Sequence, residues 1–95
     1  MMTDGEINDV VTSVLRNRLD QFGFAGSRVL SDTDFDGVPI IRVIAHYEKQ
    51  DPVPSDKLVD SLEHIRSELI RRGEERFVFL DNEYPGEAEQ DEETE

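Results

Sequence analysis

The stretch Ser31-Asp-Thr-Asp-Phe-Asp-Gly-Val38 (SDTDFDGV, residues 31–38) sets the topology of this 95-residue chain, because it joins two strand-like runs. Asp36-Gly37 lies between Phe35 and Val38. An Asp-Gly pair between apolar residues is one of the strongest short signals for a β-hairpin, since a type I′ turn needs positive φ at both central residues. We therefore predict a hairpin with strands near residues 27–35 and 38–47, the second of them rich in β-branched side chains.

A two-residue loop at Asp36-Gly37 also implies a strand register. Paired residues then share one face of the sheet: Phe35 with Val38, Thr33 with Ile40 and Val29 with Ile44. The opposite face would carry Ile41, Val43, Ala45 and Tyr47 of the second strand, together with Leu30, Asp32 and Asp34 of the first. A slip of one residue would exchange the two faces.

Apolar side chains at helical spacing predict two helices around this hairpin. Thr3-Asp-Gly-Glu6 has the form of a capping box and precedes a helix that we place at residues 5–22, ending before Gly23. Ser55 is predicted to cap a second helix that ends at Gly73. Its buried face would comprise Leu58, Val59, Leu62, Ile65, Leu69 and Ile70. The apolar run Arg76–Leu80 is predicted to be a short third strand.

The predicted order α-β-β-α-β is an α+β two-layer sandwich, a three-stranded mixed sheet with two helices on one face. The crossover through the second helix makes the second and third strands parallel if they are neighbours. We expect one domain over residues 1–82. Residues 83–95 hold seven acids and no base, and we predict that this acidic tail is disordered.

The chain carries a net charge of −13, from 23 acids and 10 bases. Removing the seven acids of residues 83–95 still leaves 16 acids against 10 bases, so the folded part is acidic as well. This balance disfavours nucleic-acid binding, which depends on basic side chains that neutralise phosphates. It suits a basic protein partner, solubility, or adaptation to high salt. The chain has no cysteine and no long apolar run, so we expect a cytoplasmic protein that contacts no membrane.

The two sheet faces predict an interaction surface. Helices on one side leave the second face open, and both faces carry apolar residues. An exposed apolar patch commonly marks a binding site. We predict that the partner interface comprises Ile41, Val43 and Tyr47, together with Val78 and Leu80 or, in their place, the two phenylalanines of the third strand.

Three motifs bear on chemistry, and none of them favours an enzyme. Asp32, Asp34, Asp36 and Gly37 spell the first half of an EF-hand loop, but position 12 of that loop would be Val43, where a bidentate Glu is required. The histidines of the chain, His46 and His64, lack further ligands at workable spacing. No nucleophile with a neighbouring base or phosphate-binding loop is evident. We therefore predict no catalytic residue, no metal ligand, no cofactor and no small-molecule ligand.

Arg66, Arg71, Arg72 and Arg76 gather around the end of the second predicted helix. They are candidates for an anion or RNA site, although compensation of the helix dipole and pairing with Glu63 and Glu68 explain them as well. The segment Ile65–Arg72 followed by Arg76–Asp81 resembles the end of ribosome-binding factor A, a type II KH-like protein. This resemblance covers about 17 residues and implies a KH-like fold. The chain departs from the family in its short connection, Gly73-Glu-Glu75, and in the place of Gly23-Phe-Ala-Gly26, which precedes a strand.

Taken together, the sequence predicts a non-enzymatic protein–protein interaction module. It would be a small acidic adaptor or antitoxin-like companion of a basic protein, or a homodimer, that uses an open sheet face. The alternative is a KH-like factor that associates with RNA or the ribosome through the arginine group.

Overall fold

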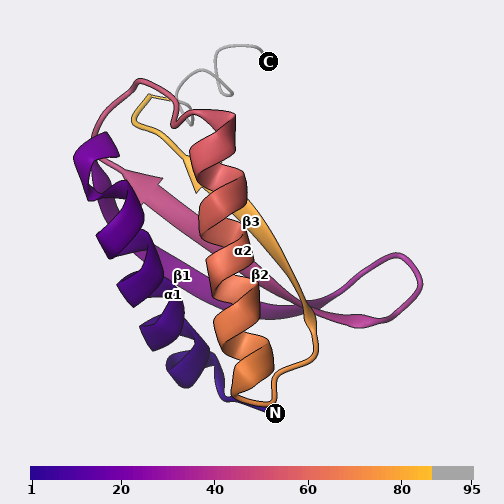
Figure 1. Cartoon of the computed structure of the whole chain (residues 1–95). Helices are drawn as coiled ribbons and strands as arrows, with labels where there is room; N and C mark the ends of the chain where they lie inside the picture. Colours follow the sequence, from indigo (N-terminus) through magenta and orange to yellow (C-terminus); the bar gives the residue numbers. More distant parts are fainter. Residues whose placement is uncertain (87–95) are drawn as a thin grey trace.

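The chain forms its helices and strands in the predicted order, α-β-β-α-β (Figure 1). The computed structural model describes residues 1–86, and the remainder of the predicted tail, residues 87–95, lies outside the described residues. The elements are helix α1 (Asp4–Leu19), the 3-10 turn η1 (Asp20–Phe22), strands β1 (Phe24–Thr33) and β2 (Pro39–Tyr47), helix α2 (Ser55–Arg71) and strand β3 (Phe77–Glu83).

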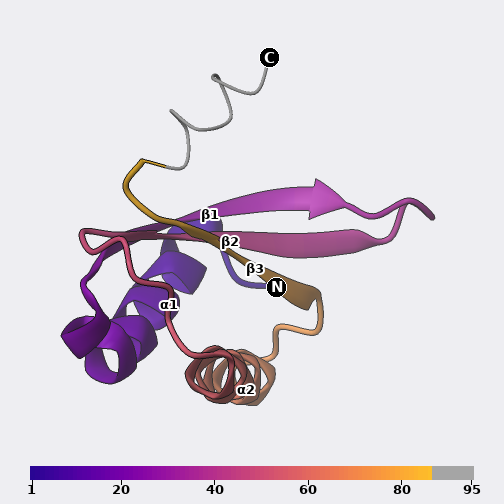
Figure 2. The ribbon, with the colours of Figure 1, turned by 90° about the horizontal axis from the view of Figure 1, so that it is seen from above.

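The strands form one three-stranded sheet in the order β1-β2-β3. β1 and β2 pair antiparallel, and β2 and β3 pair parallel, as the crossover through α2 requires. Both helices lie on the same side of this sheet (Figure 2). The predicted two-layer α+β sandwich is therefore confirmed, with β2 as the central strand of the sheet.

α1 begins with the predicted capping box. Thr3 Oγ1 accepts from the Glu6 amide at 3.1 Å, and Glu6 Oε1 accepts from the Thr3 amide at 2.9 Å. The α-helix ends at Leu19, and η1 carries the chain to Gly23, whose φ of +90° ends the helical segment. A Cβ at Gly23 would lie 2.8 Å from Lys49 Cγ, so this position favours glycine for its space as well as its φ.

α2 differs from its prediction in two respects. Ser55 is the first helical residue and not the cap, because the N-cap is Pro54, which offers no capping side chain. The buried face is also narrower than predicted. Val59 and Ile70 are 59% and 63% exposed, whereas Ile65 and Leu69, on the side of the helix that faces the core, are buried.

The hairpin loop has three residues, Phe35 to Gly37, and not the two that were predicted. The Asp34 amide donates to the Val38 carbonyl at 3.0 Å, and the Gly37 amide donates to the Asp34 carbonyl at 3.0 Å. Gly37 has a φ of +82°, as the last position of such a loop requires. Asp34 Oδ1 accepts from the amides of Asp36 and Val38, both at 2.9 Å, so this carboxylate stabilises the longer loop.

The longer loop shifts the strand register by one residue from the prediction. Val29 pairs with Val43 and Ser31 with Ile41, where Val29 was expected to pair with Ile44. Leu30 and Asp32 therefore share a face with Arg42 and Ile40, on the side opposite to Ile41 and Val43.

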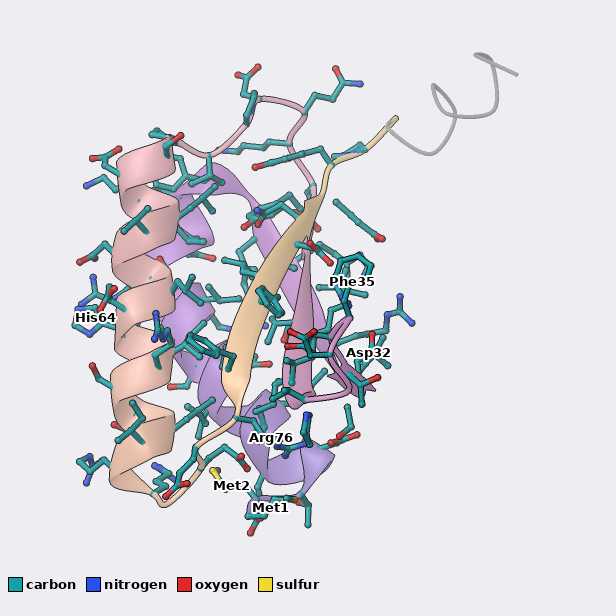
Figure 3. All side chains as sticks on the ribbon, turned by 90° about the vertical axis from the view of Figure 1, so that its right-hand side faces the viewer. Met1, Met2, Asp32, Phe35, His64 and Arg76 are labelled. Atoms are coloured by element: carbon teal, nitrogen blue, oxygen red, sulfur yellow. The ribbon has the colours of Figure 1, made fainter. Side chains whose placement is uncertain are left out.

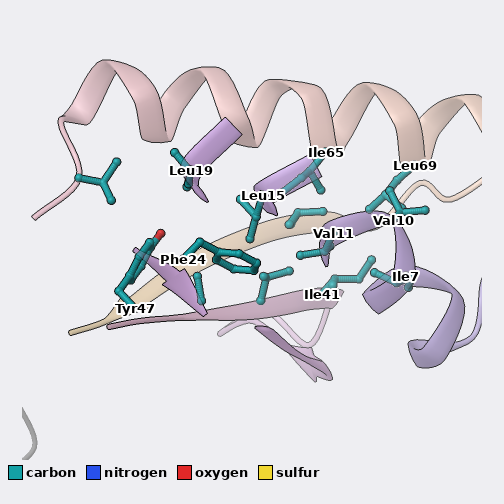
Figure 4. Close-up of a cluster of buried hydrophobic side chains, with 14 residues drawn as sticks. Ile7, Val10, Val11, Leu15, Leu19, Phe24, Ile41, Tyr47, Ile65 and Leu69 are labelled. Carbon is teal, nitrogen blue, oxygen red and sulfur yellow. The ribbon is translucent and has the colours of Figure 1, made fainter. Parts of the chain in front are cut away.

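The core lies between the helices and the sheet face that carries Ile41, Val43, Ala45 and Tyr47 (Figure 4). α1 contributes the largest share of it, with Ile7, Val10, Val11, Leu15 and Leu19. Ile65 and Leu69 of α2 also pack on this sheet face, to which Val78 of β3 belongs. Phe24 and Val53 complete the buried cluster. These residues are at most 6% exposed, so this face is the buried one.

β3 continues beyond the predicted domain boundary at residue 82. The strand runs to Glu83, and Tyr84 stacks on Tyr47 with ring centroids 4.8 Å apart. The Tyr84 hydroxyl also accepts from the Val53 amide at 3.0 Å. Tyr84 therefore packs as part of the folded domain.

The capping role of Asp34 leads to a stability prediction. Asp34→Ala removes the acceptor for two loop amides and should lower the free energy of unfolding by about 1 kcal/mol. Asp36→Ala, in the same exposed loop, should change it by less than about 0.5 kcal/mol. Urea unfolding of the variants against the wild type measures both. Equal effects of the two substitutions would contradict the role of Asp34.

Candidate interaction site on the open sheet face

The face of the sheet that the helices leave open carries an apolar patch. Phe77 and Phe79 of β3 are 59% and 44% exposed, and Leu30 of β1 is 41% exposed. Between them, Ile40 and Ile44 of β2 are buried, although they lie outside the main core cluster. The strand pairing explains this arrangement, because Ile40 pairs with Phe77 and Arg42 pairs with both Phe79 and Leu30. We call this surface the open face.

Arg42 lies at the centre of the open face and joins all three strands. Its Nε donates to Asp32 Oδ2 on β1 at 3.3 Å, and its Nη1 donates to Asp81 Oδ2 on β3 at 3.2 Å. The guanidinium also lies 6.0 Å from the centre of the Phe79 ring. The carboxylates of Asp81 and Asp32 raise the pKa of Arg42. The hydrogen bond from the Thr33 amide, and then that from Arg42, lowers the pKa of Asp32. Such exposed pairs orient side chains more than they stabilise the fold.

A hollow of about 510 Å³ lies between the hairpin and β3 on this side of the molecule. Its lining includes Phe35, Ile40, Arg42 and Phe79. Phe35, at the tip of the hairpin, is fully exposed. Figure 3 labels it together with Asp32, near the end of β1. The open face thus combines exposed apolar side chains with a recess that an apolar side chain could enter.

The far end of the open face is more polar. His46 Nδ1 lies 3.0 Å from Glu83 Oε1, and Asp81 and Arg28 flank Ile44 on either side. Along β3 the open face therefore changes from aromatic at Phe77 and Phe79 to acidic at Asp81 and Glu83.

The predicted interface residues lie on the other face of the sheet. Ile41 and Val43 are 0% exposed, Tyr47 and Val78 are buried, and Leu80 is partly buried against the core. The prediction that they form an exposed interface is wrong, because the helices cover this side. The two phenylalanines of β3, the predicted alternative to Val78 and Leu80, are exposed, but they lie on the face opposite to Ile41, Val43 and Tyr47.

The four candidate arginines do not form one cluster. Arg71 and Arg72 both donate to Glu68 Oε2, at 2.6 and 2.8 Å, and this lowers the pKa of Glu68. Arg66 lies over the Phe77 ring, 5.1 Å from its centre. Arg76 is turned inward, so the group offers no continuous cationic surface.

Arg76 forms a largely buried ion pair that no sequence pattern indicates. Its Nε donates to Glu74 Oε2 at 2.9 Å and its Nη2 to Glu74 Oε1 at 3.1 Å. Glu74 Oε1 also accepts from the Met2 amide at 2.9 Å, and Arg76 Nη2 donates to the Met2 carbonyl at 3.3 Å. Figure 3 shows Arg76 directed toward the N-terminal residues. The pair joins the start of β3 to the start of α1 and is structural.

The remaining polar candidates occupy separate places. Asp34 caps the hairpin loop, and Asp32 pairs with Arg42, so two of the three EF-like carboxylates have structural partners. Within residues 1–86 no group of three acidic or histidine side chains is placed to hold a metal ion. His64 accepts from Arg18, which also pairs with Asp60, at an open polar groove between the two helices.

Comparisons with protein-family models, with curated proteins and with solved structures return no significant match for this chain. Neither helix in the described part of the chain has the length and apolar content needed to cross a bilayer.

Proposed function

We propose that this protein is a non-enzymatic protein-interaction module and that its partner contacts the open face. The observation that carries the proposal is the pair of aromatic rings, Phe77 and Phe79, that remain 59% and 44% exposed beside the buried Ile40. Aromatic residues beside an apolar recess are typical of the energetically dominant positions in interfaces. The surrounding polar rim, with Asp32, Arg42 and Asp81, supplies orientation and specificity.

The net charge of −13 favours a partner with a basic surface over a second copy of this chain. We therefore propose an adaptor or companion of a basic protein, in the cytoplasm, ahead of a homodimer. Association with RNA, the function implied by the KH-like resemblance, has less support. Its candidate arginines are neutralised by Glu68, buried with Glu74, or stacked on Phe77.

Phe79→Arg should reduce partner binding by at least about 30-fold, because it places a charge in the centre of the contact surface. The fold should survive, since the Phe79 side chain is solvent-accessible. The control Asn17→Arg adds the same charge at an exposed position of α1, in the other layer. Affinity capture from an extract of the source cells, followed by titration of the captured partner against each variant, measures the effect.

Two results would count against the proposed function. One is a partner that tolerates Phe79→Arg but is lost with Asn17→Arg, which would move the binding surface to the helical layer. The other is capture of RNA alone, in salt-sensitive complexes that weaken with Arg71→Ala and Arg72→Ala.

A further inference from the structure

Four of the exposed apolar side chains of residues 1–86 lie on the two elements that border the free edge of β3. β3 pairs with β2 on one side only, because the sheet order is β1-β2-β3. Phe77 and Phe79 border this edge on the open face. Two further exposed apolar residues, Val59 and Ile70, lie on α2. Their position relative to the edge follows from the geometry of the helix.

α2 turns one side toward α1 and the opposite side toward the free edge of β3. Lys57, Ser61 and His64 line the groove between the two helices. Val59, Arg66 and Ile70 lie about half a turn around the helix from that groove. Arg66 and Ile70 accordingly share a small recess with Phe77 and Val78 of β3. In Figure 3, which views the molecule from this side, β3 faces the viewer beside α2.

The helical layer therefore extends beneath the β3 edge and presents apolar side chains there. A strand added beside β3 would contact Phe77 and Phe79 on one of its faces and Val59 and Ile70 on the other. Arg66 of α2 lies over the Phe77 ring at the start of this edge, but the strand itself carries none of the usual features that prevent such pairing. Phe77–Leu80 is a run of four apolar residues without the proline, lysine or bulge that commonly blocks an edge strand. At the other edge, β1 carries a register irregularity between Phe24 and Gly26.

A second copy of this chain fits the edge poorly. An antiparallel β3–β3 pair centred on Leu80 would place Phe77 opposite Glu83 and Phe79 opposite Asp81. A pair centred on Asn82 would place Asp81 opposite Glu83, two like charges. A pair centred on Val78 matches the phenylalanines but uses only the first three residues of the strand. The charge pattern of the edge thus favours a different strand.

We infer that the free edge of β3 accepts a fourth strand from the partner protein, an extended segment with basic residues followed by apolar residues. This inference rests on the proposed function. In the antiparallel orientation, which gives the more stable ladder, lysine or arginine side chains lie opposite Glu83 and Asp81. Apolar side chains then lie opposite Phe79 and Phe77. Backbone hydrogen bonds supply affinity, and the alternating side chains supply specificity.

The test uses three synthetic peptides and charge-reversed variants of the full chain. The first peptide has two lysines and then two valines at alternate positions, with threonine between them. The second has glutamate in place of lysine. The third is the lysine peptide with proline in place of each threonine. Proline has no amide hydrogen to donate to a strand ladder. We expect the lysine peptide to bind and to protect amides of Phe77–Glu83 from hydrogen exchange, and we expect the proline peptide not to bind.

Charge reversal gives the matched comparison. Asp81→Lys should weaken the lysine peptide by about tenfold and should create binding of the glutamate peptide. Asp36→Lys makes the same change in net charge at the exposed hairpin loop. It should change the affinity for either peptide by no more than about twofold. Ile70→Ser should weaken the lysine peptide, because it removes an apolar contact on the helix side of the edge.

Some results would overturn the inference while leaving the proposed function intact. Binding of the proline peptide, or binding without protection of β3 amides, would indicate packing on the open face and no fourth strand. Failure of the lysine peptide, in a chain whose partner is still lost with Phe79→Arg, would exclude this edge but retain the open face. If light scattering showed a dimer of this chain, and the β3 amides were protected in that dimer, the strand added at the edge would come from a second copy.

Discussion

Glu74→Gln should lower the free energy of unfolding by about 3 kcal/mol, a large effect for a single hydrogen-bonding side chain. Glu74 is 2% exposed, and its carboxylate accepts from Arg76 and from the Met2 amide. The substitution removes the charge of the one ion pair that Arg76 makes within residues 1–86 and leaves a largely buried guanidinium without that partner. An uncompensated charge in the interior costs more than the loss of a surface ion pair.

The same pair predicts a particular dependence of stability on pH. The Arg76 guanidinium lowers the pKa of Glu74 from 4.5 to about 2. Because the folded-state pKa is the lower one, the pair stabilises the fold fully above the unfolded-state pKa. That contribution is lost as the pH falls from about 4.5 toward about 2.

Urea unfolding at several pH values measures both effects. Glu74→Gln should unfold at lower urea at pH 7 and should lose less further stability than the wild type as the pH falls below about 4.5. Glu75→Gln, at the exposed neighbouring position, is the control and should behave like the wild type. Glu74→Met combined with Arg76→Met should recover much of the loss, since neither charge then remains buried. Equal effects of Glu74→Gln and Glu75→Gln would show that the pair contributes little.

The sequence predicts this fold well because its strongest signals are local. The capping box at Thr3, the helical spacing of the α1 core and the Asp-Gly turn each act within a few residues. The antiparallel hairpin and the parallel crossover then follow from chain connectivity. The prediction of Ser55 as the helix cap is wrong because the preference for serine at that position is statistical, and Pro54 occupies it here.

The candidate site was harder to predict because it depends on which face of the sheet the helices cover. Alternation in β2 correctly groups Ile41, Val43 and Tyr47 on one face, but it does not indicate whether that face is covered. The Asp34 carboxylate is the side-chain acceptor that favours three loop residues over two. The longer loop shifts the pairing between β1 and β2 by one residue. The Glu74–Arg76 pair gave no signal, since Glu74, Glu75 and Arg76 look alike as a charged loop and only the fold buries two of them.

Ile41→Ala should lower the free energy of unfolding by about 3 kcal/mol, whereas Phe77→Ala should lower it by less than about 1 kcal/mol. Ile41 is 0% exposed between the sheet and the helices, so its truncation leaves a cavity that the surrounding side chains fill only in part. Phe77 is the larger side chain but is 59% exposed on the open face, and its removal opens no cavity.

The comparison tests the orientation of the sheet directly, because the two residues lie on opposite faces of neighbouring strands. Urea unfolding gives both free energies. Equal dependence of the unfolding free energy on urea concentration would show that the two variants expose similar surface areas when they unfold. Partner binding should follow the opposite order. Phe77→Ala should weaken it by about tenfold or more, and Ile41→Ala should leave it unchanged under conditions where the variant is folded. If Phe77→Ala were the more destabilising change, the helices would cover the aromatic face, and the interaction site would return to Ile41, Val43 and Tyr47.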